Sequence, residues 1–303
     1  MKPKIIIAGG NGYLGKLLAN HWGADMYDIV ILTRKPCNLK NTRTVLWNGV
    51  DTGDWVAELE GAFALINFAG RSVDCRYTKK NKKEIIQSRV KSTHALGIAV
   101  QGCKNPPQVW LNASSATIYP HSEKEKMTEA YTDFGNSFSD TVCKVWEETF
   151  FAVPSPATRK AALRIALVMG NNGGAFPVLK KLAQLGLGGK MGKGTQYISW
   201  IHEQDFCRAI DYVLNQPIEG AVNISAPQPE TNQHFMESLR QGLGKRFGIN
   251  HPRWLLEIGA ILLQTETELI LKSRNVVPHR LLENGFEFEY PSITESFKSL
   301  LKD

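Results

Sequence analysis

Short apolar runs alternate with amphipathic stretches through the first 170 residues of the chain. The apolar runs, rich in β-branched residues, predict strands at 4–8, 28–33, 45–47, 64–68, 109–113 and 162–168. Apolar positions three and four residues apart predict helices between them, most clearly at 13–21, 81–101 and 139–151. Strands that alternate with helices in this way predict an α/β fold with a doubly wound parallel sheet, covered by helices on both faces.

The pattern changes after Gly170. Glycine-rich stretches fill much of 170–202 and predict loops that lie on the surface or over a ligand. A helix at 203–215, a strand at 221–224 and a helix at 233–242 are predicted next. From about residue 250 the sequence is mostly helical, with a short extended stretch at 286–290 and a final helix. We therefore predict a large α/β domain at 1–249 and a small C-terminal domain at 250–303.

Composition and charge narrow the class of protein. Of 303 residues, 43% are hydrophobic and 21% are charged, values near the average of soluble globular proteins that exclude disorder as the main state. The net charge of +7 is concentrated in basic stretches at 79–83 and 272–274. No aromatic platform interleaves with these lysines, so we interpret them as solvated helix surface and expect no nucleic-acid partner.

Cysteine usage and the longest apolar runs bear on location. The five cysteines are scattered and form no CxxC pair, which predicts a reducing, cytoplasmic environment and no metal site. The first apolar run, IIIA, is far shorter than the core of a secretory signal. The run that starts at Trp254 is interrupted by Glu257 and is about half as long as a membrane-spanning helix. No membrane association is expected.

The first predicted strand leads directly into GGNGYLG, which places Gly9, Gly10, Gly12 and Gly15 where the strand gives way to a helix. This spacing satisfies the dinucleotide fingerprint G-x-G-x-x-G. The glycines permit a tight turn and a close approach of the backbone to a pyrophosphate, and the helix start offers free N–H groups to it. The sequence therefore predicts a Rossmann-type nucleotide-binding site at 9–15.

The end of the second predicted strand indicates which dinucleotide binds. Cofactors without a 2′-phosphate are usually held there by an acidic side chain. Here the strand ends in Thr33, Arg34 and Lys35, and a guanidinium attracts a phosphate that a carboxylate would repel. We predict NADP(H) rather than NAD(H); the alternative is a basic turn that only faces solvent.

Several motifs together resemble one family. The segments INFAG at 66–70, SSATIY at 114–119 and SWIHEQD at 199–205 resemble the extended short-chain dehydrogenase/reductases of the epimerase/dehydratase group. The segments SRVKST at 88–93, CKVWE at 143–147, LGLGGKMGKGTQYISWIH at 185–202, NISAPQP at 223–229 and VVPHRLLENGFEFEYP at 276–291 are similar to its atypical branch, known only as "epimerase family protein". That branch carries a C-terminal domain of unknown function, and the resemblance covers essentially the whole chain.

The resemblance implies a set of cofactor-binding residues. Along the pyrophosphate it places Gly9, Asn11, Gly12, Tyr13, Leu14 and Gly15, and at the adenosine ribose and its phosphate Thr33 and Arg34. Phe68, Ala69 and Gly70 would follow the cofactor, Glu84 and Arg89 would border it, and Val168 would pass its nicotinamide end. The segment 170–202 would form a wall of the substrate site, which suits a small polar or carbonyl ligand. The first domain, 1–249, would thus bind NADP(H).

In the parent group, catalysis uses a serine, a tyrosine and a lysine. Ser115 matches the serine. Two registers are open for the other two: one places Lys144 on the lysine and Asp140 on the tyrosine, and the other places Cys143 and Ser139 there. Neither register supplies a phenol. The other candidates for its role are Tyr119, Tyr131 and His202.

The sequence therefore predicts Ser115 and Lys144 as catalytic residues of an oxidoreductase or isomerase that acts on a carbonyl or hydroxyl carbon of an unidentified small molecule. A general acid or base contributes about 10²–10⁴ to a rate, and its loss leaves the phosphate contacts untouched. The missing phenol thus leaves a second hypothesis open: a catalytically silent NADP(H)-binding regulator or redox sensor.

Overall fold

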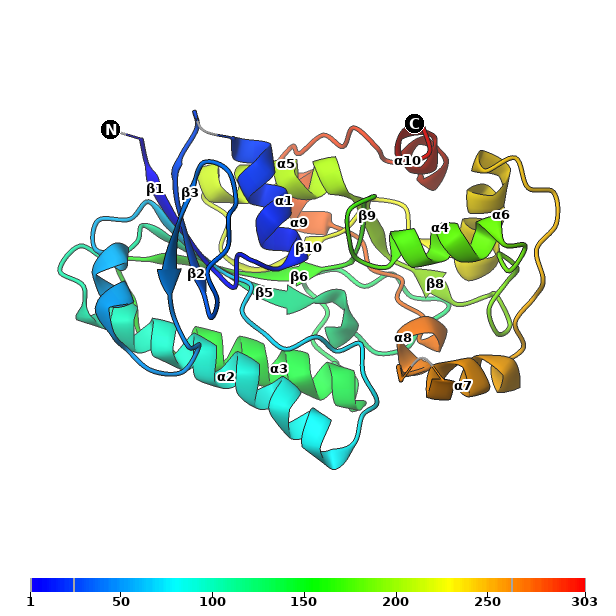
Figure 1. Ribbon diagram of the computed structural model, residues 1–303, viewed down its shortest axis with the longest axis horizontal. Helices are drawn as coiled ribbons and strands as arrows, with labels where there is room; N and C mark the ends of the chain where they lie inside the picture. The colour runs from blue at the N-terminus through cyan, green and yellow to red at the C-terminus, as the bar shows by residue number, and fades with distance from the viewer. Residues whose placement is uncertain (1, 24, 263, 303) are drawn as a thin grey trace.

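A seven-stranded sheet forms the centre of the molecule (Figure 1). The structure, a computed structural model, describes residues 2–23, 25–262 and 264–302. Neighbouring strands all pair in parallel, in the order β10-β6-β5-β4-β1-β2-β3. They are β1 (Lys4–Ala8), β2 (Asp28–Thr33), β3 (Thr42–Leu46), β4 (Ala64–Asn67), β5 (Val109–Ser115), β6 (Arg159–Ile165) and β10 (Gly220–Ile224). This topology confirms the predicted doubly wound Rossmann-type fold.

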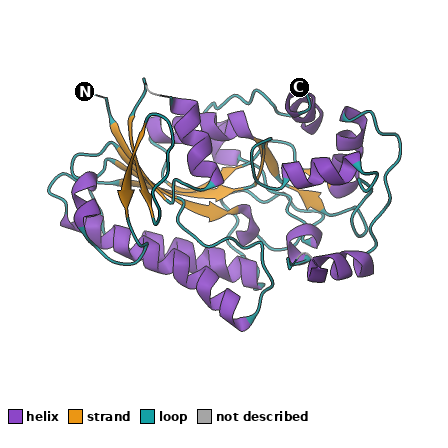
Figure 2. Cartoon of the chain, in the orientation of Figure 1, coloured by secondary structure: helices purple, strands orange, loops and turns teal. Residues whose placement is uncertain are grey.

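Helices cover both faces of this sheet (Figures 1 and 2). On one face lie α1 (Tyr13–Trp22) and α5 (Glu203–Asn215), and on the other α2 (Lys79–Gly102) and α3 (Phe138–Phe151). Leu18 and Phe206 belong to the first layer of core, whereas Leu96 and Phe150 belong to the second. The central strands are apolar on both sides because both sides are buried. Two short 3₁₀ helices, η1 (Asp54–Leu59) and η2 (Ala116–Ile118), complete this half.

The direction of the connections reverses between β1 and β4, which are neighbours in the sheet. The chain runs outward from β1 to β3 and then returns to β4 before it proceeds to β5 and β6. The carboxyl ends of strands diverge at such a switch point and leave a crevice that receives ligands. The glycine turn after β1 and the segment 68–70 after β4 both lie here, since Phe68 N–H donates to Ala8 O at 2.8 Å.

A second, smaller core lies beyond the carboxyl edge of the sheet, at the right of Figure 1. Phe297 of the last helix stacks on Phe176 with ring centroids 5.8 Å apart and meets Phe235 at 5.1 Å. These residues come from both sides of residue 250, so the two predicted domains share this core. Its elements are β7 (Leu167–Met169), α4 (Phe176–Gln184), β8 (Tyr197–Ile198), β9 (Trp200–His202), β11 (Glu230–Thr231), α6 (Asn232–Gly242), α7 (Arg253–Leu262), α8 (Glu268–Leu271) and α10 (Ile293–Leu300). Helix α9 (His279–Glu283) packs instead against β10, and its Leu281 belongs to the core of the main sheet.

Three expected elements differ from those observed. The strand predicted at 162–168 is two strands, because the Ala166 N–H bonds Ile224 O while the next N–H bonds Ser199 O, so that β7 leaves the main sheet to pair with β9. The stretch 286–290 is not a strand: the N–H groups of Glu289 and Tyr290 donate instead to the carboxylate of Asp205. Helix α4 lies within 170–202, where only loops were expected.

Candidate functional site

The glycine turn has the shape that its sequence predicts. Gly9 has a positive φ of 74°, and a Cβ on it would lie 2.8 Å from the backbone of Ala69. Its N–H donates to Leu32 O at 2.9 Å, and its carbonyl accepts from Gly12 N–H at 3.0 Å. No side chain caps the start of α1 at Gly12, so the first N–H groups of this helix are left for an anion.

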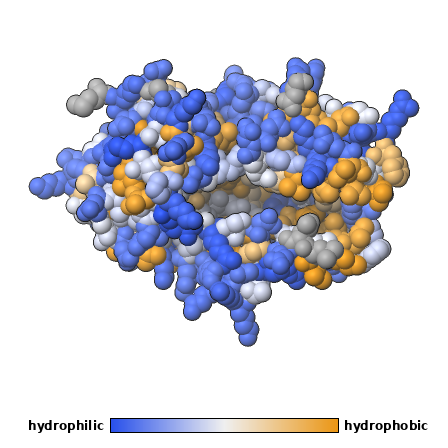
Figure 3. Space-filling model, in the orientation of Figure 1, coloured by the Kyte–Doolittle hydropathy of each residue, from blue (hydrophilic) through white to orange (hydrophobic). Residues whose placement is uncertain are grey.

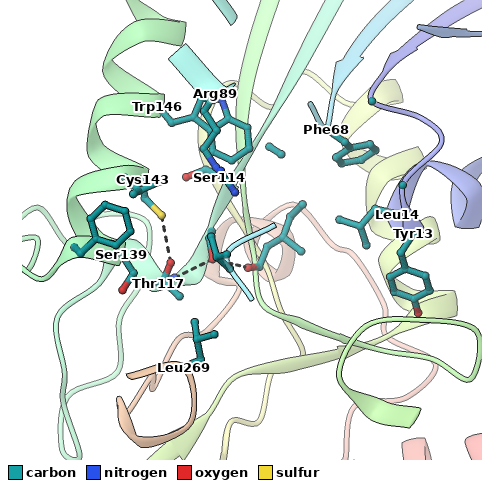
Figure 4. Close-up of a pocket in the computed structure, with 18 of the residues that line it drawn as sticks. Tyr13, Leu14, Phe68, Arg89, Ser114, Thr117, Ser139, Cys143, Trp146 and Leu269 are labelled. Carbon is teal, nitrogen blue, oxygen red and sulfur yellow. Dashed lines mark hydrogen bonds between the residues drawn. The ribbon is translucent and has the colours of Figure 1, made fainter. Parts of the chain in front are cut away.

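A cavity of about 310 Å³ runs from this turn to the end of β5 (Figure 4), below a face of the molecule that is hollowed across its middle (Figure 3). Leu14 and Phe68 lie on one side of it, and Arg89, Ser114 and Cys143 on the other. The cavity is lined by Gly9, Gly12, Tyr13, Leu14, Gly15, Phe68, Val73, Tyr77, Arg89, Ala113, Ser114, Ser115, Thr117, Phe138, Ser139, Val142, Cys143, Trp146, Ile165 and Leu269. It thus joins a predicted phosphate site to the predicted catalytic serine.

Tyr13 fastens the turn to the glycine-rich segment. Its hydroxyl donates to Glu203 Oε2 at 3.2 Å, and its ring packs against Gly173 so closely that a Cβ there would overlap it. Burial and the neighbouring carboxylate raise the pKa of Tyr13, so the phenol stays protonated. Burial likewise raises the pKa of Glu203. Tyr13 therefore lines the cavity with its ring while its hydroxyl is engaged elsewhere.

Arg89 places a guanidinium in the wall of the cavity. Its Nη1 donates to the carbonyls of Arg71 and Ile85 at 3.0 Å, and its guanidinium lies 4.9 Å from the centre of the Trp146 ring. Burial lowers the pKa of Arg89. Glu84, predicted with it, is instead paired with Arg71 outside the cavity.

Thr33 and Arg34 lie at the carboxyl end of β2, at the same edge of the sheet as the glycine turn. Thr33 is buried and its carbonyl accepts from Trp47 N–H at 3.0 Å. The Arg34 side chain is exposed and has no hydrogen-bond or ion-pair partner among the described residues. It is available to a ligand phosphate, but the enclosed part of the cavity does not reach it.

Four other predicted cofactor residues lie beside the cavity without lining it. Asn11 lies within the turn, Ala69 donates its N–H to Asn67 Oδ1 at 2.9 Å, and Gly70 approaches the side chain of Arg89. Val168 is buried in β7, opposite Ile201. Because β7 has left the main sheet, Ile165 lines the cavity where Val168 was expected.

Ser115 ends β5 and faces the cavity. Its Oγ accepts from Thr117 N–H at 3.2 Å, which fixes the start of η2, and its own proton points at Ile165 O over 3.4 Å. The second bond is long and weak. The Thr117 N–H therefore orients the hydroxyl oxygen, while the hydroxyl proton can turn to another acceptor.

Helix α3 decides between the two catalytic registers. Ser139, Val142, Cys143 and Trp146, spaced three and four apart, all line the cavity. Lys144, one position further on, points its ammonium at Asn136 Oδ1 at 3.3 Å and is not among the lining residues. The structure thus does not bring Lys144 to Ser115, and of the two registers it is the one with Ser139 and Cys143 whose residues line the cavity. Cys143 Sγ lies 3.2 Å from Thr117 Oγ1 (Figure 4).

The other candidates for the missing phenol are engaged elsewhere. The Tyr119 hydroxyl is buried among Thr128 O, Asn223 Oδ1 and the Arg164 guanidinium, all within 3.0 Å. Tyr131 packs edge-on to the Tyr119 ring and does not line the cavity.

His202 accepts Gln204 N–H at Nδ1 and caps α5. Burial lowers its pKa to about 4, so it is neutral at physiological pH.

Sequence reasoning missed the residues that close the far end of the cavity. Tyr77 and Phe138 pack edge to face there with ring centroids 4.7 Å apart, and Leu269 reaches in from α8 (Figure 4). Glu268, beside it, accepts hydrogen bonds from Ser137 and Ser139 at the start of α3. These contacts span about 130 positions of sequence, and no local motif signals them.

Within residues 2–23, 25–262 and 264–302, no group of three or more histidine, cysteine, aspartate or glutamate side chains is arranged to hold a metal ion. None of the helices described there is both long enough and apolar enough to cross a membrane.

Comparison with known proteins adds a family to this geometry. The model of the NAD dependent epimerase/dehydratase family matches residues 5–225. The chain belongs to this family. A domain of unknown function, DUF1731, matches residues 251–300. The chain is 30% identical to the epimerase family protein SERP0438 of Staphylococcus epidermidis over 300 residues, 99% of each chain, and 31% identical to the epimerase family protein SSP1921 of Staphylococcus saprophyticus over 98% of each.

Solved structures agree with this assignment. The human epimerase family protein SDR39U1, solved with NADPH, matches with a TM-score of 0.88 and 25% identity over 99% of both chains. A nucleoside-diphosphate sugar epimerase from Corynebacterium glutamicum matches with a TM-score of 0.77 and 25% identity, over 99% of this chain and 58% of that one. The resemblance expected from the sequence is confirmed, and with it a nicotinamide dinucleotide as the class of cofactor. The turn fits such a group, because Gly9, Gly12 and Gly15 line the cavity without side chains and the start of α1 has no side-chain cap.

Proposed function

We propose that the protein binds NADP(H) and acts as an oxidoreductase or isomerase on a carbonyl or hydroxyl carbon of a small molecule. The observation that carries this proposal is the shared cavity: the glycine turn, Arg89 and Ser115 line one continuous space of about 310 Å³. A dinucleotide whose pyrophosphate rests on the turn would extend along this space toward Ser115.

Different residues would hold the pyrophosphate, the 2′-phosphate and the nicotinamide of the cofactor. The N–H groups of 13–15, uncapped at the start of α1, face the pyrophosphate, and Arg34, exposed at the end of β2, pairs with the 2′-phosphate. The human relative was solved with NADPH, which supports this choice over NAD(H). Phe68 and Ile165 supply apolar walls for the nicotinamide. When bound, the dinucleotide supplies the donor or acceptor of a hydride.

The chain's own residues polarise the substrate. Ser115 Oγ, oriented by Thr117 N–H, can turn its proton from the distant Ile165 carbonyl to a substrate oxygen. Burial raises the pKa of Cys143, so this side chain stays a protonated thiol beside Thr117 rather than a nucleophile. Without a phenol in the parent position, we expect turnover to be slower than in relatives that have one, by about 10²–10⁴.

The second candidate is a silent NADP(H)-binding regulator or redox sensor. It is favoured by α3, which presents Ser139 and Cys143 to the cavity where the parent pattern has tyrosine and lysine. Such a protein would bind the dinucleotide and perform no chemistry. In either case we propose a cytoplasmic location, since all five cysteines are free.

Stopped-flow measurement of NADPH oxidation against a panel of aldehydes, ketones and oxo acids distinguishes the two functions. The enzyme hypothesis predicts oxidation that depends on substrate and falls by about 10²-fold or more in Ser115→Ala, whereas the remote Ser155→Ala control keeps wild-type rates. NADPH affinity should be unchanged in both variants. Oxidation that is absent across the panel, with NADPH still bound, would leave the silent regulator.

A further inference from the structure

At the end of the cavity beyond Ser115, Leu269 of the C-terminal segment forms part of the wall, and Arg274 donates to its carbonyl from behind. We propose that this end binds the carboxylate of a small substrate, which is held by the guanidinium of Arg274 and the hydroxyl of Tyr77. The proposal rests on the proposed function in one respect: the substrate occupies the cavity next to Ser115 and the nicotinamide site. It adds the chemical class of that substrate.

Arg274 has one bonded edge and one free edge. Its Nη1 donates to the carbonyls of Leu269 at 3.3 Å and Lys272 at 3.5 Å. Its Nε and Nη2 are buried and have no hydrogen-bond partner among the described residues. The N–H bonds of Nε and Nη2 point in parallel and form the fork that matches the two oxygens of a carboxylate. A buried cation with an unpaired edge is costly, so the free fork indicates a ligand.

Tyr77 supplies a third free donor at this end of the cavity. Its ring lines the cavity against Phe138, and its hydroxyl is buried without a partner in the described structure. Burial raises the pKa of Tyr77, so the phenol keeps its proton and donates. Leu269, whose carbonyl holds the guanidinium of Arg274, lines the same cavity as Tyr77. A carboxylate between Arg274 and Tyr77 would satisfy all three free donors.

The balance of charge selects a monoanion. Lys272 is paired with Asp140 and also donates to Thr117 O at 3.0 Å. The carboxylate of Glu268 accepts hydrogen bonds from two serine hydroxyls, and its negative charge compensates the positive charge of one guanidinium. Glu266 accepts from the Tyr77 N–H at 2.6 Å and pairs with Arg76 at 3.5 Å. With Arg89 and Arg274, this end holds four cations against three carboxylates, so one positive charge is left over. A carboxylate neutralises it, whereas a phosphate dianion would leave a net negative charge in a buried place.

The walls suit a small acid with an apolar body. Leu269 lines the cavity with its side chain and holds Arg274 with its carbonyl, so the guanidinium lies directly behind this wall. A rotation of the Leu269 side chain gives an anion access to the fork. Val73, Phe138 and Trp146 add apolar surface. Because the same cavity of about 310 Å³ also receives the nicotinamide, little room is left for a sugar nucleotide.

Calorimetric titration of the NADPH-saturated protein tests this inference with matched ligands. The probes are cyclohexanecarboxylate and 3-methylbutanoate, each paired with its uncharged primary amide, and methylphosphonate as a dianion. We expect each carboxylate to bind about 30-fold or more tightly than its amide, and the phosphonate to bind less tightly than the carboxylates.

Four variants test which residues cause the preference for carboxylates over amides. Arg274→Met should reduce carboxylate affinity by about 30-fold or more and leave the amides unchanged, and Arg274→Lys, which keeps the charge but not the fork, should recover only part of the loss. Tyr77→Phe should cost about threefold to tenfold. The exposed Arg246→Met control should match the wild type.

The affinity for NADPH is measured first in every variant. It distinguishes a failure of the proposed function from a failure of the carboxylate site alone. A wild type that binds no NADPH contradicts the proposed function. A protein that binds NADPH normally but prefers amides or methylphosphonate, or an Arg274→Met variant that folds, binds NADPH and retains carboxylate affinity, overturns the carboxylate site alone. If Arg274→Met does not fold, Arg274→Lys decides by the same criterion.

Discussion

The two ends of the cavity are built in different ways. At the cofactor end, the groups that face a ligand are backbone N–H groups of consecutive residues, 13–15, at the start of α1, and their geometry follows from the turn that precedes them. At the substrate end, the groups are side chains, and Tyr77, Ser115 and Leu269 come from three distant segments. The first end depends on local conformation, whereas the second depends on tertiary packing. The same fold can therefore keep a cofactor site while its chemistry changes.

Buried charge holds the substrate end together. Glu147 of α3 makes a bidentate ion pair with Arg164 of β6 at 2.9 Å and accepts from Ser114 Oγ at 2.6 Å. Arg164 donates in turn to the Tyr119 hydroxyl at 2.8 Å. This network fixes the cavity face of α3 against the end of β5. Among the described residues, no comparable network of charges supports the glycine turn. Close backbone contacts stabilise the turn instead.

The largest effect should come from the buried pair. Glu147→Leu leaves the Arg164 charge uncompensated, and we expect a loss of about 3–5 kcal/mol in the free energy of unfolding, measured with urea. The double variant with Arg164→Met should recover most of that loss. Glu58→Leu removes an exposed partner of Arg43 and should cost under about 1 kcal/mol. Equal losses for the buried and the exposed pair would refute the role given to the network.

Next in size is the glycine turn. Gly9→Ala places a Cβ against the Ala69 backbone at a positive φ, whereas Gly23→Ala meets only the positive φ, because no atom lies within 4 Å of its Cβ position. We expect Gly23→Ala to cost about 1–2 kcal/mol of stability and to bind dinucleotide normally. Gly9→Ala should cost more and abolish binding, as followed by thermal unfolding and calorimetry. Normal NADPH affinity in Gly9→Ala would remove the turn from the site.

Arg34 sharpens the choice of cofactor. Arg34→Ala should weaken NADPH binding by about 10- to 100-fold and leave NADH binding unchanged, because only the 2′-phosphate pairs with the guanidinium. Lys40→Ala, an exposed cation further along, is the control. If the wild type binds NADH as tightly as NADPH, the end of β2 is only a basic turn.

The smallest effect should follow a change at Lys144. Because its ammonium contacts Asn136 outside the cavity, Lys144→Met should change stability by less than about 0.5 kcal/mol and leave any NADPH oxidation rate within about twofold. A tenfold loss of rate without a loss of stability would restore Lys144 to the catalytic machinery.

The same contrast explains what could be predicted from the sequence. The strands from β1 to β5, the helices between them and the glycine turn could be predicted because each depends on local periodicity or on a short motif. The register of α3 could not, since Cys143 and Lys144 are neighbours in sequence and only packing decides which one faces the cavity. The pairing of Lys272 with Asp140 joins residues 132 positions apart and leaves no local trace. The break between β6 and β7 at Ala166 likewise arises from hydrogen bonds to two distant residues, Ile224 and Ser199.

The central claim is that one dinucleotide spans both ends, with its nicotinamide beside Ser115. A crystal structure of the NADPH complex measures this directly, as the distance between the nicotinamide ring and Ser115 Oγ. We predict that the ring lies within about 4 Å of this oxygen, the reach that reacting groups require, with the pyrophosphate on the N–H groups of the glycine turn. A dinucleotide bound with its nicotinamide outside the cavity, or crystals grown in saturating NADPH that contain none, would contradict the account.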